Sequence, residues 1–234
     1  MSIFLILTNM FYAELIVPIF NKLKPLNNGS LKNKIEAYSK KVGYSLSKIY
    51  VIDGSKRSSK ANAFFSGLGS RKTIALYDTL IEKHTEDELV AVLAHEVGHY
   101  KKKHNVKGIM LAVIQSGVMF YFMSIFLNNT TLFEAFKMEN LSVYASLLFF
   151  SILYSPIDLI MSFVMNAISR KHEFEADEFS ALTLKNTSHL ISGLKNLTVK
   201  NLGNLTPHPF PVFLSYSHPP VLDRITALKK LNLQ

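Results

Sequence analysis

An uncharged apolar run of 20 residues, GIMLAVIQSGVMFYFMSIFL at 108–127, constrains the fold of this chain most strongly. A helix needs about 20 such residues to cross the hydrocarbon core of a bilayer, and a buried helix of a soluble domain is usually shorter. Two more stretches have comparable length: 2–20, interrupted by Glu14, and 141–168, which contains Asp158. Because a charge facing lipid is costly, Asp158 should face protein or a water-filled cavity. We therefore predict an integral membrane protein with about three transmembrane helices.

The distribution of charge sets the expected orientation of these spans. The net charge is +9, and the basic residues concentrate in 21–107 and after the third span, whereas the loop 128–140 is slightly acidic. Because basic loops stay on the cytoplasmic side, 21–107 and 169–234 should both face the cytoplasm, at the endoplasmic reticulum or the bacterial inner membrane. The basic residues are not interleaved with aromatic stacking side chains, which argues against nucleic-acid binding. The chain has no cysteine, which excludes disulfides, thiolate metal ligands and a cysteine nucleophile.

Hydrophobic periodicity and turn residues predict the structure of the two cytoplasmic segments. The expected elements are helices over 29–44, 85–104, 171–184 and 221–231, a strand over 48–55 and a β-hairpin over 61–78. Thr85 and Glu88 form the pattern of a capping box at the start of the second helix. We expect these pieces and the spans to form one membrane-embedded domain over 1–234, mainly α-helical, with a small β-hairpin or sheet.

The motif HEVGH lies at 95–99, inside one of the predicted helices. Residues four apart share a helix face, so His95 and His99 can both reach one metal ion. Glu96 is offset by about 100° and can act on a water beside the ion without binding the ion itself. This is the HExxH pattern of two zinc ligands and a general base for metal-assisted peptide hydrolysis. The alternative is a polar helix face that binds nothing.

A catalytic zinc needs a third protein ligand and an open position for water. The longer pattern HExxHxxGxxH is excluded, because the chain has Lys102 and Asn105 where that pattern needs glycine and histidine. Glu173 and Asp177 in HEFEAD are also four apart and share a face. One of these carboxylates could bind zinc while the other accepts a hydrogen bond from a ligating histidine. The alternative is an ordinary charged helix surface.

Three more polar residues are considered for the site. His104 follows His99 by five residues and should point elsewhere on the helix. Glu175 lies on a different face from Glu173 and Asp177. His218, in the segment SHPP, is held before two prolines. It is either a donor to the oxyanion of a tetrahedral intermediate or an ordinary loop histidine.

Four blocks of sequence, taken in order, match one known family. They are GSKRSSKANAFF (54–65), LAHEVGHYKKKHNVK (93–107), SRKHEFEADEFS (169–180) and YSHPPVLDRI (216–225). From about residue 10 to its C-terminus the chain resembles the type I CAAX prenyl proteases, integral-membrane zinc metalloproteases also known as a-factor-converting enzymes. Many metallopeptidases share HExxH, whereas GSKRSS…NAFF and SHPP…R are much more specific.

The resemblance implies a gluzincin site that holds one Zn²⁺ per chain. It implies that His95, His99 and Glu173 bind zinc and that Glu96 is the general base. His218 would stabilise the oxyanion, and Asp177 would accept a hydrogen bond from a ligating histidine. Arg224 would support the acidic side of the site by pairing with Asp177. Asn62 and Ala63 would hold the substrate backbone, since an extended peptide can add to the exposed edge of their strand.

The resemblance also implies an activity: a membrane-bound zinc metalloendopeptidase that cleaves peptide or protein substrates that are membrane-associated or prenylated. Family members have several more spans before the point where this chain starts. The chain is therefore expected to be a fragment, the product of a truncated gene, or a reduced form that oligomerises. Two other functions stay open: a heat-shock-type protease that removes damaged membrane proteins, and a catalytically inactive membrane scaffold that retains the zinc site.

Overall fold

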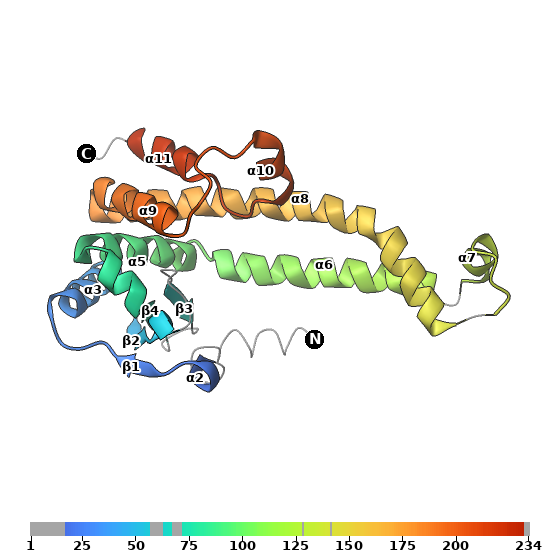
Figure 1. The fold of residues 1–234 in the computed structure, drawn as a ribbon, viewed down its shortest axis with the longest axis horizontal. Coiled ribbons are helices and arrows are strands. Elements are labelled where there is room, and N and C mark those ends of the chain that lie inside the picture. Colours follow the sequence, from blue (N-terminus) through green and yellow to red (C-terminus); the bar gives the residue numbers. More distant parts are fainter. Residues whose placement is uncertain (1–16, 57–62, 67–71, 128, 141, 232–234) are drawn as a thin grey trace. The chain divides into compact units, whose positions relative to one another are not determined.

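The computed structural model describes residues 17–56, 63–66, 72–127, 129–140 and 142–231. The described residues are mainly α-helical, as predicted (Figure 1). They divide into two compact units. The first holds the residues up to His104, Lys171–His208 and those from Pro219 onward, and the second holds Asn105–Arg170 and Pro209–His218. The single domain expected over 1–234 stays a prediction.

The first unit combines a small sheet with helices. Its elements are α2 Val17–Phe20, β1 Leu23–Pro25, α3 Ser30–Lys41, β2 Leu46–Ile52, the 3₁₀ helix η2 Gly54–Lys56, β3 Ala63–Ser66, β4 Lys72–Tyr77, α4 Asp78–Lys83, α5 Glu86–Lys101, the end of α8 (Val143–Leu184), α9 Ser188–Lys200 and α11 Val221–Lys229. The four strands have the order β1-β2-β4-β3, with β2 parallel to β4 and the outer strands antiparallel to their neighbours. The β3–β4 pair confirms the predicted hairpin. Within the described residues, β3 is an edge strand.

The capping box predicted at the start of α5 is present. The Thr85 hydroxyl accepts from the backbone N–H of Glu88, whose carboxylate accepts from the backbone N–H of Thr85. Ser192 and Asn196 of α9 donate to the same carboxylate. Burial opposes ionisation of this group, but the hydrogen bonds from Ser192, the Thr85 backbone and Asn196 hold the pKa of Glu88 below its ordinary value. The start of α5 is therefore tied both to its own cap and to α9.

A hydrophobic core fixes the orientation of α5. One face of the helix packs with α3, β2 and β4; the cluster includes Leu31, Ile35, Ile49, Ile74, Leu76, Leu89, Leu93 and Val97. Burying each large aliphatic side chain contributes about 1.5–3 kcal/mol relative to leaving it exposed. Since this face is held against the sheet and α3, the neighbouring face with His95 and His99 has a defined direction.

Several helix boundaries differ from the prediction. The helices expected over 29–44 and 221–231 end at Lys41 and Lys229. The helix expected over 85–104 ends at Lys101, because Lys102 caps it and Lys103 takes a left-handed backbone conformation with φ of 58°. The predicted span over 141–168 and the predicted helix over 171–184 are one continuous helix, α8. Charged residues follow apolar ones at this junction, but none of them breaks a helix.

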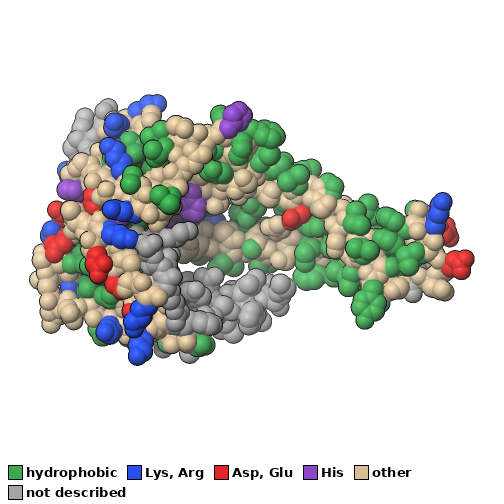
Figure 2. Space-filling view, viewed as in Figure 1, with side chains coloured by type: hydrophobic (Ala, Val, Ile, Leu, Met, Phe, Trp, Pro, Cys, Tyr) green, Lys and Arg blue, Asp and Glu red, His purple; other side chains and the backbone are tan. Residues whose placement is uncertain are grey.

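The second unit consists of α6 (His104–Phe126, whose first residue belongs to the other unit), α7 (Thr130–Ala135), the first part of α8 and α10 (Pro209–Ser215). Among the described residues, α6 and α8 are long and apolar enough to cross a membrane, which fits two of the three predicted spans. Hydrophobic side chains gather over this unit in Figure 2. Asp158 is exposed and accepts a hydrogen bond from Gln115 at 3.3 Å; that it faces protein or a water-filled cavity stays a prediction. The span predicted over 2–20 lies outside the described residues, apart from 17–20.

Candidate metal site

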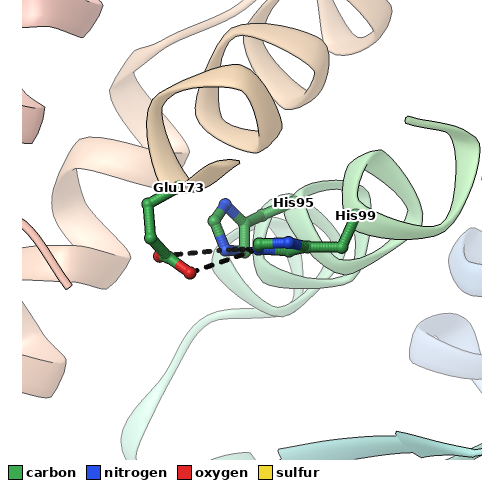
Figure 3. Close-up of side chains that lie close together, drawn as sticks. All are labelled: His95, His99 and Glu173. Atoms are coloured by element: carbon green, nitrogen blue, oxygen red, sulfur yellow. Dashed lines mark hydrogen bonds and ion pairs between the residues drawn. The ribbon is translucent and has the colours of Figure 1, made fainter. Parts of the chain in front are cut away.

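Three potential metal ligands converge between α5 and α8 (Figure 3). His95 Nε2 lies 3.1 Å from His99 Nε2, and two Glu173 oxygens lie 3.6 Å and 3.3 Å from these two nitrogens. Zinc binds such ligands at about 2.0–2.2 Å in tetrahedral geometry, which places neighbouring ligand atoms about 3.3 Å apart. The spacing of the three side chains is therefore close to that of ligands on one zinc ion.

The chemistry of the three ligand atoms also suits a cation. His95 and Glu173 are buried and His99 is partly buried. In their ligating forms all three atoms present lone pairs toward one point, and such a group repels itself unless a positive charge lies between its members. Two imidazole nitrogens and one carboxylate are the protein ligands of one common kind of catalytic zinc site.

The other ring nitrogen of His95, Nδ1, is hydrogen-bonded to Asp177. His95 Nδ1 donates to Asp177 Oδ1 at 2.8 Å, which leaves the Nε2 lone pair facing the other two ligands. Arg224 donates to both Asp177 oxygens, from Nε at 2.7 Å and from Nη2 at 2.6 Å, and its Nη1 lies 3.1 Å from Glu173. The pairing of Arg224 with Asp177 expected from the sequence is therefore present. Burial opposes the charge, but the hydrogen bonds to Asp177 hold the pKa of Arg224 above its ordinary value.

Glu96 follows His95 directly on α5 and is partly buried. Burial raises the pKa of Glu96 above its ordinary value, because the ionised carboxylate loses contact with water. A carboxylate with a raised pKa accepts a proton more readily than an exposed one does. The residue beside the ligands thus has the property that a general base requires.

Gly98 allows the two ligand-bearing helices to approach closely. A Cβ atom built on Gly98 would lie 3.0 Å from Ala176 Cα and 3.1 Å from the Ala176 carbonyl oxygen. Ala176 lies between Glu173 and Asp177 and is fully buried. This role was not predicted, although each of the two motifs contains a small residue at the point of contact.

Comparison with known proteins identifies the family. Residues 25–232 match the family model described as Peptidase family M48. The chain belongs to this family. It is 37% identical over 229 residues to CAAX prenyl protease 1 of Saccharomyces cerevisiae, covering 91% of this chain and 50% of that protein. It is 34% identical over 265 residues to the CAAX prenyl protease 1 homolog of Homo sapiens, covering 94% and 54%.

A comparison with solved structures gives a match of the same kind. The crystal structure of S. mikatae Ste24p matches with a TM-score of 0.86 and 36% identity, over 97% of this chain and 55% of that chain. The resemblance to CAAX prenyl proteases seen in the sequence is therefore confirmed. This M48 chain spans about half the length of the curated relatives that it matches.

The position predicted for His104 in this M48 site is wrong. His104 does not point away from the ligands: its Nδ1 lies 3.0 Å from Nδ1 of His99, and its Nε2 lies 2.9 Å from Glu175 Oε2. The reason is the left-handed turn at Lys103, which ends α5 and brings the next residue back toward it. The lysine run at 101–103 gave no signal of such a turn, because left-handed residues are usually glycine or asparagine.

Three other predicted residues keep roles that stay predictions. Asn62 lies outside the described residues. Ala63 begins β3, where it pairs with Leu76 of β4. His218 is exposed and belongs to the second unit, where its Nδ1 lies 3.0 Å from the Ser217 hydroxyl.

Proposed function

We propose that this chain is a membrane zinc metalloendopeptidase that cleaves membrane-associated or prenylated CAAX-type substrates. The observation that carries the proposal is the convergence of His95, His99 and Glu173 at zinc-ligand spacing, with Glu96 beside them on the same helix. The substrate class rests on the relatives, which are named CAAX prenyl protease 1. The metal is zinc because of the ligand types and their spacing.

Each side chain has a separate task in this proposal. When bound, zinc supplies Lewis acidity that polarises a peptide carbonyl and lowers the pKa of water. Glu96 takes the proton of the attacking water and later passes it to the leaving amine. Asp177 and Arg224 keep His95 in the orientation and tautomer that present Nε2 to the metal.

The substrate contacts are proposed from the sheet and from the resemblance. A peptide in extended form can add to the outer edge of β3, which would place Asn62 and Ala63 along its backbone. His218 would donate to the oxyanion that forms during attack. Both assignments extend the family's pattern to this chain and await tests by mutation.

The membrane setting follows from α6 and α8, which are apolar and long enough to span a bilayer. By the distribution of basic residues, the metal site faces the cytoplasm, at the endoplasmic reticulum or the bacterial inner membrane. The chain spans about half the length of these relatives.

A cleavage assay on the detergent-purified chain tests the function. Wild type and Glu96→Gln are compared on a farnesylated CAAX peptide and on the same peptide without the lipid. We expect wild type to cleave the farnesylated peptide preferentially and Glu96→Gln to lose about 10²–10⁴-fold in rate, the usual contribution of a general base.

Other outcomes of this assay favour the alternatives. Equal cleavage of both peptides by wild type would favour a quality-control protease. Cleavage of neither by a zinc-loaded protein would favour the scaffold. Undiminished cleavage by Glu96→Gln would refute the assignment of the base.

A further inference from the structure

We propose that His104 and Glu175 form a hydrogen-bonded relay that orients the zinc ligand His99 and fixes its tautomer. This inference rests on the proposed function, because it takes His99 Nε2 to be the atom that binds the metal. It makes His104 and Glu175 positioning residues, which act on the site through His99.

The order of hydrogen bonds follows from the position of His99 Nε2. This nitrogen faces His95 and Glu173 and must present a lone pair to a metal, so the ring proton sits on Nδ1. His99 Nδ1 therefore donates to His104 Nδ1 across 3.0 Å. His104 then carries its own proton on Nε2, which donates to Glu175 Oε2 across 2.9 Å. With both rings neutral, this order satisfies every nitrogen.

The surroundings of His104 hold its ring in place. Its side chain is buried, with 3% of its surface exposed. The ring stacks on His172, with centroids 3.9 Å apart and planes 10° from parallel. Glu175 is partly exposed and also lies 3.8 Å from Lys171. The relay therefore runs from the partly buried ligand His99 to a carboxylate near the surface.

The two histidine ligands are thus supported in different ways. His95 reaches a carboxylate directly, since Asp177 lies 2.8 Å from its Nδ1. The Nδ1 of His99 meets an imidazole instead, because the turn at Lys103 places His104 there. The Glu175 carboxylate, acting through the ring of His104, still fixes the tautomer and the ring plane of His99.

The test measures zinc affinity of the detergent-purified full chain by competition with a chromophoric chelator. We expect His104→Ala to weaken zinc binding by about 10–100-fold, the usual effect of losing a partner behind a metal ligand. His104→Asn should recover most of this loss, because its amide oxygen can accept the His99 N–H near the position of Nδ1. Adding Glu175→Ala to His104→Ala should cause no further loss, since the relay is already broken.

A matched control separates this role from a loss of stability. His84 is likewise a buried histidine within hydrogen-bonding distance of a glutamate, with its Nδ1 3.2 Å from Glu88, but it lies beside the capping box at the start of α5, 11 residues before His95. His84→Ala should lower thermal stability and leave the affinity for zinc unchanged. His104→Asn keeps the test valid if His104→Ala fails to fold.

The outcomes distinguish this inference from the proposed function. If wild type binds zinc and His99→Ala does not, but His104→Ala binds as tightly as wild type, the relay alone is refuted. Equal weakening in His104→Ala and His104→Asn would also refute it, because the acceptor would then be irrelevant. Absence of zinc from wild type would overturn the proposed function itself.

Discussion

Replacing Gly98 by alanine should disturb the approach of α5 to α8. The added Cβ would lie 3.0 Å from Ala176 Cα, 3.1 Å from its carbonyl oxygen and 3.1 Å from Phe179 Cβ. Carbon atoms pack best at about 3.5–4.0 Å, so the two helices must separate by about half an ångström. The Ala176 atoms belong to the backbone and cannot rotate away, so the whole segment of α8 has to move.

Two opposing terms set the change in stability. Overpacking costs about 1–3 kcal/mol, while alanine gains about 1 kcal/mol over glycine in a helix interior. The net result for Gly98→Ala is a loss of about 0–2 kcal/mol. The effect on zinc should be clearer, because ligand distances tolerate changes of only about 0.2 Å and Glu173 moves with Ala176.

Gly193 offers a matched control for the same substitution. It is buried in the interior of α9 and faces α5, but a Cβ there would meet Glu88 and Val92 at 3.8 Å, an ordinary contact. Gly193→Ala should therefore gain up to about 1 kcal/mol and keep wild-type zinc affinity. The assays are thermal unfolding in detergent and competition for zinc. Wild-type zinc affinity in Gly98→Ala, with stability equal to that of Gly193→Ala, would refute this reasoning.

Three further predictions concern charge and metal. Glu88→Gln should lower the melting temperature at pH 7. Because the folded pKa of Glu88 is depressed, the stabilisation by its carboxylate is complete above about pH 4.5 and disappears as pH falls through the folded pKa. The melting temperature of Glu88→Gln should therefore depend less on pH over that range than the melting temperature of wild type does. Arg224→Ala should destabilise by about 3–5 kcal/mol in chemical unfolding, because the buried Asp177 carboxylate loses its cation; Arg224→Lys should recover only part, since lysine lacks the paired donors. Removing zinc with a chelator should lower the melting temperature of wild type but not of His95→Ala, because a metal that binds only the folded state stabilises it.

Local sequence patterns predicted much of the scaffold. The capping box at Thr85, the hairpin of β3 and β4, and the shared face of His95 and His99 depend on neighbouring residues, and all of them are present. The sequence predicts two helices where α8 is continuous, because apolar residues are followed by charged ones between 168 and 171. Such a change alters what surrounds the helix and leaves its backbone hydrogen bonds intact.

Tertiary geometry decided the parts of the site that were missed. The stacking of His104 on His172 and the close approach at Gly98 depend on residues about 70–80 positions away. No spacing rule connects such positions. Helix α9, which tethers Glu88, was not predicted, although its Leu190, Leu194 and Leu197 recur at helical spacing.

Zinc content, measured on the same preparations as peptidase activity, is the decisive test of the proposed metal site. One preparation each of wild type, Glu96→Gln and His95→Ala would be analysed by mass spectrometry for metal and assayed on the farnesylated peptide. We expect one zinc per chain in wild type and Glu96→Gln, none in His95→Ala, and cleavage by wild type alone. Wild type without zinc, or His95→Ala with a full complement of zinc, would contradict it.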